Sequence, residues 1–132
     1  MNRYVESIEQ LVTEIMVKDI RVSTAFYQRL GFKLLRDGGD FVELTWEDHR
    51  LYLAEISAVH DLNDIDLQPK PGFPRANVRV MVANVDHYWK LANEMAAEII
   101  VPIADRYYGL RDFTIADPDG FGVRFASNLH KQ

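Results

Sequence analysis

The 132-residue sequence contains no cysteine, so disulfides and thiol chemistry can contribute neither to its fold nor to its function. It also lacks an apolar run of about 18 residues, which a membrane-spanning helix would need. Its start, MNRYVESIEQ, is polar and acidic and does not have the pattern of a signal peptide. These absences predict a cytoplasmic protein with no membrane partner.

An excess of basic residues is missing as well. The chain has 15 Lys and Arg against 20 Asp and Glu, for a net charge of −5. Nucleic acid binding needs a basic footprint, so this balance disfavours a nucleic-acid partner, whereas it suits cationic ligands. The length and a hydrophobic share of 48% suit one compact domain with a sizeable core.

The strongest positive feature is an internal repeat. Residues 15–35, IMVKDIRVSTAFYQRLGFKLL, and residues 80–100, VMVANVDHYWKLANEMAAEII, each begin with an apolar strand and end with a second one. Between the strands each copy has a helix-capping residue, Asp19 or Asn84, followed by apolar residues at helical spacing. The helical pattern consists of Val22, Phe26 and Leu30 in the first copy and of Val85, Tyr88, Leu91, Ala92 and Met95 in the second.

Two further strands follow each helical segment. The turns between them read EDH in the first copy and DPDG in the second, and the latter is a strong hairpin signal in which Asp117 and Asp119 are expected to form the turn. The second copy also has a longer loop, VPIADRYYGLR at 101–111. The predicted strands are 40–46 and 50–56 in the first copy and 112–116 and 121–127 in the second.

The repeated unit is therefore βαβββ. We predict one domain over 1–132, with repeats at 11–56 and 76–127 joined by a linker at 57–75 that is rich in Asp and Pro.

Three segments resemble a known family: VKDIRVSTAFYQRLGFKLL in the first half, and VRVMVANVDHYWKLA and YGLRDFTIADPDGFGVRFA in the second. Over roughly residues 11–127 the chain resembles the vicinal oxygen chelate superfamily of glyoxalases, bleomycin-resistance proteins and extradiol dioxygenases. The resemblance implies an α+β fold in which paired βαβββ modules form a curved mixed sheet around a cavity, usually in a dimer. It does not imply one function, because the superfamily hosts many activities.

Metal-dependent members of that superfamily bind a divalent ion with His or Glu side chains, two from each half. The matching positions here are Val12, Tyr52, Asn77 and Arg124. Valine offers no ligand atom, and arginine brings a permanent cation to the place of the ion. The resemblance therefore predicts no metal cofactor and is closest to the bleomycin-resistance branch, which binds its drug without changing it.

Strand alternation then assigns the residues to two faces. With the four metal positions facing the cavity, Glu14 and Arg79 also point inward, and as repeat mates they either pair with each other or contact a ligand. Arg124 is expected to be a fixed cation in the cavity whose protein partner would be Glu14. Met16, Ala54, Met81 and Ala126 are predicted to line the same face, while Leu11, Thr13, Ile15, Val17, Val78, Val80 and Val82 lie under the helices.

Three aromatic residues are further candidates. Trp46 and the loop pair Tyr107 and Tyr108 could stack on a planar ligand, although Trp46 fits a core or dimer contact equally well. Trp89, in the second helical segment, fits packing better than binding. The full set of predicted ligand-binding residues is Glu14, Trp46, Tyr52, Asn77, Arg79, Tyr107, Tyr108 and Arg124.

These observations predict a metal-free homodimer of the bleomycin-resistance type that sequesters a planar, amphipathic, antibiotic-like small molecule. Such a ligand would be cationic at its exposed end and polar or anionic at its inserted end, with a planar aromatic part against Trp46 or Tyr107. No catalytic residue is expected, because the metal-ligand positions hold neither His nor Glu. Nucleophilic catalysis in particular has no support, because cysteine and a G-x-S-x-G motif are absent. Two alternatives stay open: a lyase, isomerase or dioxygenase-like enzyme, metal-free or with displaced ligands such as Glu43 or Glu55, and a structural or regulatory module.

Overall fold

A computed structural model describes residues 5–58 and 74–129. The chain divides into two compact units, residues 1–67 and 68–132. Most of the predicted linker 57–75 lies outside the described residues. None of the helices within the described ranges is long and apolar enough to cross a membrane.

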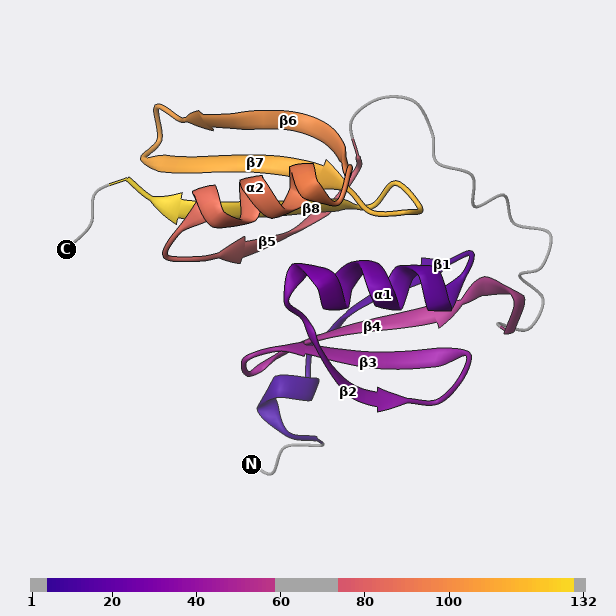
Figure 1. Ribbon diagram of the computed structural model, residues 1–132. Coiled ribbons are helices and arrows are strands. Elements are labelled where there is room, and N and C mark those ends of the chain that lie inside the picture. Colours follow the sequence, from indigo (N-terminus) through magenta and orange to yellow (C-terminus); the bar gives the residue numbers. More distant parts are fainter. Residues whose placement is uncertain (1–4, 59–73, 130–132) are drawn as a thin grey trace. The chain divides into compact units, whose positions relative to one another are not determined.

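The first unit is a four-stranded sheet with one helix across it (Figure 1). Its strand order is β1-β4-β3-β2, with β1 parallel to β4 and the other neighbours antiparallel. The elements are η1 (Ser7–Glu9), β1 (Thr13–Val17), α1 (Ile20–Leu30), β2 (Lys33–Asp37), β3 (Phe41–Trp46), β4 (His49–Glu55) and η2 (Ile56–Ala58).

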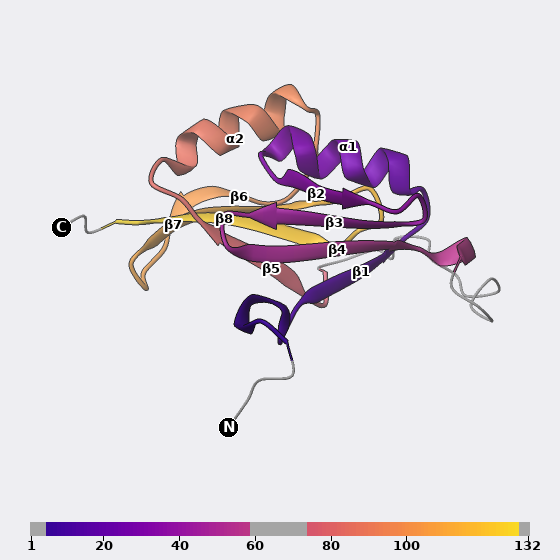
Figure 2. The ribbon, with the colours of Figure 1, turned by 90° about the horizontal axis from the view of Figure 1, so that it is seen from below.

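The second unit repeats this architecture. Its strand order is β5-β8-β7-β6, with β5 parallel to β8, and Figure 2 shows each helix on one side of its own sheet. The predicted pair of βαβββ modules is therefore confirmed. The elements are β5 (Asn77–Met81), α2 (Val85–Glu94), β6 (Glu98–Asp105), β7 (Leu110–Ala116) and β8 (Gly122–Asn128).

Both helices begin at the predicted capping residues. The Asp19 carboxylate accepts hydrogen bonds from the backbone N–H of Arg21 at 3.0 Å and of Val22 at 3.3 Å. The Asn84 side-chain oxygen accepts one from the His87 N–H at 3.4 Å. Such caps satisfy N–H groups that have no partner inside the helix.

The core of each unit lies between its helix and its sheet. Ile15 and Val17 are buried under α1 as predicted, but Leu11 is 94% exposed, so its predicted burial is wrong. Val22, part of the predicted helical pattern, is 52% exposed. Leu11 precedes β1, which begins at Thr13, so no strand carries it under the helix. Val22 is on the outer side of α1, whose buried residues are Ile20, Ser23, Thr24, Tyr27 and Leu30.

The segment 101–111, predicted as a loop, is largely strand. β6 continues to Asp105 and keeps pairing with β7 through two irregularities in register, because bulges accommodate extra residues without ending a ladder. Pro102 is tolerated there because β6 is an edge strand. The hairpin turn that remains spans only residues 106–109.

Candidate functional site

The register of the second sheet brings three of the predicted residues to one face. Arg79 on β5 is paired with Arg124 on β8, and Asn77 is paired with Gly122 two residues earlier on each strand. Paired residues point to the same side of a sheet, and residues two apart share a face. Asn77, Arg79 and Arg124 therefore all project from the face opposite to the buried helix side.

The first sheet arranges its candidates in the same way. Glu14 on β1 is paired with Tyr52 on β4, which in turn is paired with Glu43 on β3. The Tyr52 ring meets the Phe41 ring edge-on with 5.5 Å between centroids. Glu14 and Tyr52 thus share a face, as the alternation predicted.

Trp46 lies apart from these candidates, on the helix-facing side of its sheet. Its ring packs edge-on against the buried Phe32, with 5.1 Å between centroids, and it closes over Gly31 at the end of α1. This placement favours the core alternative for Trp46. Trp89 likewise packs against the buried Phe113, at 5.2 Å.

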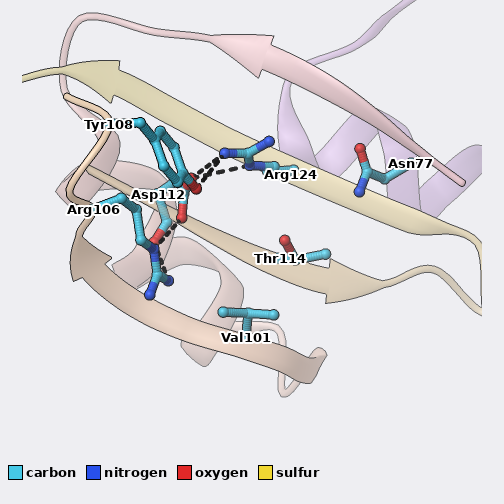
Figure 3. Close-up of a pocket in the computed structure, with 7 residues that line it drawn as sticks. All are labelled: Asn77, Val101, Arg106, Tyr108, Asp112, Thr114 and Arg124. Carbon is cyan, nitrogen blue, oxygen red and sulfur yellow. Dashed lines mark hydrogen bonds and ion pairs between the residues drawn. The ribbon is translucent and has the colours of Figure 1, made fainter. Parts of the chain in front are cut away.

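A pocket of about 390 Å³ opens on the face that carries Arg124 (Figure 3). Of the predicted binding residues, Asn77, Tyr108 and Arg124 line it, whereas Tyr107 is 99% exposed at the turn. The complete lining is Asn77, Val101, Arg106, Tyr108, Asp112, Thr114 and Arg124.

Asp112 is the shared acceptor of a hydrogen-bond cluster in this pocket, and the sequence patterns did not single it out. Its side chain is 4% exposed and accepts hydrogen bonds from two arginines on opposite sides, as Figure 3 shows. Arg106 Nε donates to Oδ1 at 2.7 Å. Arg124 donates to Oδ2 through Nε at 3.0 Å and also through Nη2. The carboxylate is therefore shared between two guanidinium groups.

Tyr108 completes this cluster. Its hydroxyl donates to Asp112 Oδ2 at 3.1 Å and accepts from Arg124 Nη2 at 2.9 Å. Arg106 also donates to the Pro102 carbonyl at 2.7 Å, which ties the turn to β6. Both arginine side chains keep about a quarter of their surface exposed, 23% for Arg106 and 22% for Arg124.

The expected partner of Arg124 was Glu14, and the structure shows Asp112 instead. The pairing of β7 with β8 explains the difference. Thr114 is directly opposite Arg124, so Asp112, two residues earlier, shares its face on the neighbouring strand. Counting outward from the DPDG hairpin would have given this register, and with it Asp112, from the sequence alone.

Two opposing effects set the ionisation of Asp112. Burial by itself would raise the pKa of the carboxyl, but the hydrogen bonds from Arg124 and Arg106 and the positive charge of Arg124 outweigh it and hold the pKa below its usual value. Asp112 is thus a carboxylate at neutral pH, with its oxygens occupied by donors. It is a poor general acid, because it carries no proton to give.

The family follows from the sequence match. The model of the Glyoxalase/Bleomycin resistance protein/Dioxygenase superfamily matches residues 7–125. The chain belongs to this superfamily. None of the curated proteins matches the chain significantly, so the match shows the superfamily without a branch.

Solved structures agree on the fold. A protein of unknown function from Agrobacterium tumefaciens str. C58 is 27% identical, with a TM-score of 0.75 over 97% of this chain and 100% of that one. A glyoxalase/bleomycin resistance protein/dioxygenase from Nocardioides is 17% identical, with a TM-score of 0.71 over 94% of this chain and 87% of that one. The fosfomycin resistance protein FosX from Listeria monocytogenes is 15% identical, with a TM-score of 0.66 over 89% and 91%.

The side chains at the four positions that the resemblance matches to metal ligands do not fit a divalent ion. Val12 has no donor atom, and the Arg124 guanidinium is itself bound to the one carboxylate of the pocket lining. The two carboxylates considered as displaced ligands have other partners. Glu43 accepts from Arg36 at 2.9 Å, and Glu55 accepts from the N–H of Ile20 at 3.0 Å, at the start of α1.

Proposed function

We propose that this protein is a metal-free small-molecule-binding protein of the bleomycin-resistance type, which sequesters its ligand and leaves it chemically unchanged. One observation carries the proposal. Arg124, at a position where metal-dependent members place a ligand, is an ion-paired wall of a pocket. A permanent cation there cannot act as a Lewis base toward a metal, but it can bind a ligand.

The chemistry of the pocket supports binding over catalysis. Its one carboxylate, Asp112, is ionised and already accepts from three side chains. The remaining lining consists of two arginines and the side chains of Asn77, Val101, Tyr108 and Thr114. The volume of about 390 Å³ is within the range of small-molecule sites. Such a mixed wall suits an amphipathic ligand with a planar part beside Tyr108.

Superfamily members named for a particular activity do not favour a second candidate here. FosX is named for fosfomycin resistance, but at 15% identity its likeness extends to the fold alone. No residue arrangement in the described ranges supports an enzyme over a binding protein.

The test is calorimetric titration of the protein with bleomycin and a panel of other planar amphipathic compounds, followed by mass spectrometry of the recovered compound. We expect at least one compound to bind and to be recovered unchanged. We also expect Arg124→Ala to lower the free energy of binding by more than it lowers the free energy of unfolding. Arg111→Ala is the matched control, because Arg111 lies on the same sheet but pairs with Asp86 and Asp105 away from the pocket. Recovery of an altered compound would refute sequestration.

Elemental analysis of the purified protein tests the metal-free part of the proposal. We expect no stoichiometric Zn, Ni, Mn or Fe. About one tightly held ion per chain, removable only by a chelator, would overturn it.

A further inference from the structure

Arg79 and Arg124 face each other across the β5–β8 pair. They are register partners on neighbouring parallel strands and project from the same face. Neighbouring strands lie about 4.8 Å apart, so two cationic side chains emerge side by side. Like charges directly opposite each other destabilise a sheet unless an anion lies between or beside them.

The anions available within the second unit do not balance these charges. Asp112 is bonded to both Arg106 and Arg124, so that cluster has two positive groups and one negative group. Within residues 74–129, the side chain of Arg79 forms no hydrogen bond or ion pair, and it adds a further positive charge. Glu98 is on the same face, but it pairs with Ala116 from β6, at the far edge of the sheet from Arg79.

Arg124 is held in one orientation with donors to spare. Asp112 and Tyr108 engage its Nε and Nη2, and within the described residues its Nη1 donates no hydrogen bond. Figure 3 shows the remaining guanidinium nitrogen pointing away from Asp112. A donor group that is already oriented loses little entropy when a ligand binds it.

Asn77 adds a neutral donor to the same face of the sheet. It is two residues before Arg79 on β5 and lines the pocket. The absence of a side chain at Gly122 lets it lie close, because a Cβ at Gly122 would be 2.7 Å from the Asn77 Cβ.

We infer that this site binds the oxyanion end of its ligand, a carboxylate or a phosphate, between the side chains of Arg79 and Arg124, with Asn77 as an additional donor. The inference rests on the proposed function and specifies the inserted end of the sequestered molecule. Guanidinium groups are planar forks whose donors match carboxylate and phosphate oxygens. A cationic group at this end would instead meet an excess of positive charge.

The test uses two simple probes, inorganic phosphate and benzoate, titrated into the full chain at low ionic strength. Binding is followed by NMR shifts of the arginine Nε–H groups. The variants are Arg79→Gln and Arg124→Gln, with Arg111→Gln as the control on the opposite face. We expect at least one probe to bind wild type and Arg111→Gln equally, and the other two variants to bind about tenfold more weakly, the effect of losing a charge-assisted hydrogen bond.

Arg79→Gln keeps the test decisive even where Arg124→Gln fails to fold, because Arg79 is exposed and outside the ion-pair cluster. Binding of phosphate alone indicates a phosphorylated ligand, and binding of benzoate indicates a carboxylate. The inference is wrong if neither probe binds, or if Arg79→Gln binds as tightly as wild type. If neutral planar compounds still bind to the protein when the inference fails, the proposed function stands without the oxyanion site. If an anionic compound binds through Arg79 but is recovered chemically altered, the proposed sequestration is refuted and the inference about the oxyanion stands.

Discussion

Asp112 and Arg124 lie diagonally across the β7–β8 pair, and the guanidinium of Arg124 donates to Oδ2 of Asp112 through two nitrogens. The ion pair with Asp112 occupies one side of the Arg124 guanidinium, and the other side of the guanidinium faces the pocket. A carboxylate 4% exposed and two arginines nearly a quarter exposed form a cluster that is both structural and available to a ligand.

Removing the charge of Asp112 should destabilise the second unit. Asp112→Asn leaves two guanidinium groups side by side without their shared anion, so we expect the free energy of unfolding to fall by about 2 kcal/mol. Urea unfolding of both proteins measures the difference. Asp86→Asn is the control, because Asp86 is a 60% exposed partner of Arg111 and should cost less than about 0.5 kcal/mol. Equal losses in the two variants would contradict a special role for Asp112.

The same carboxylate gives a pH dependence of defined sign. The pKa of Asp112 is lower in the folded protein than its ordinary value of about 3.9. Its contribution to stability is therefore fully present above about pH 4, and it is lost as the pH falls through the folded pKa. The stability difference between wild type and Asp112→Asn should be constant from pH 5 to about 7 and should shrink below pH 4. A gap that widens on acidification would contradict this assignment.

At Gly122 the neighbouring β5 leaves no room for a side chain, and an alanine there should push β5 away. The new Cβ would meet the Asn77 Cβ at 2.7 Å and the Ala76 carbonyl at 3.1 Å, so we expect Gly122→Ala to cost about 1–3 kcal/mol. Asn77→Gly removes the nearer contact and should offset part of that cost in the double variant. A double-mutant cycle by urea unfolding measures the coupling. Strictly additive losses would show that the contact is not the cause.

Much of the fold could be predicted from local patterns, because caps and alternation act over short distances. Asp19 and Asn84 begin their helices as predicted, and the alternation placed Arg79 and Arg124 on one face. Asp112 was missed because its role depends on the register between two strands, which no single-strand pattern contains. The last part of β6 was predicted as a loop, because a strand whose pairing contains bulges has no regular alternation of apolar and polar residues.

Assembly is a prediction of its own. Each sheet ends in edge strands, β1 and β2 in one unit and β5 and β6 in the other, and exposed edges favour pairing with a second chain. β2 also carries Leu34 and Leu35, which are 45% and 47% exposed. We expect a homodimer with about twice the 15.3 kDa of the chain. Light scattering that gave the mass of one chain over a wide concentration range would contradict it.

The three aromatic candidates should separate into three behaviours. Trp46 packs on Phe32, so Trp46→Ala should lower the free energy of unfolding by about 3 kcal/mol. A Trp46→Phe variant that still folds should bind ligand as wild type does.

Tyr108→Phe keeps the ring but loses the hydroxyl that bridges Asp112 and Arg124, so binding should weaken several-fold while the free energy of unfolding changes by less than about 1 kcal/mol. Tyr107→Ala, at a side chain 99% exposed, should change stability least. Thermal unfolding paired with calorimetry against the best-binding compound gives both quantities for each variant. Loss of affinity in Trp46→Phe with unchanged stability would place Trp46 in the binding site and contradict its assignment to the core.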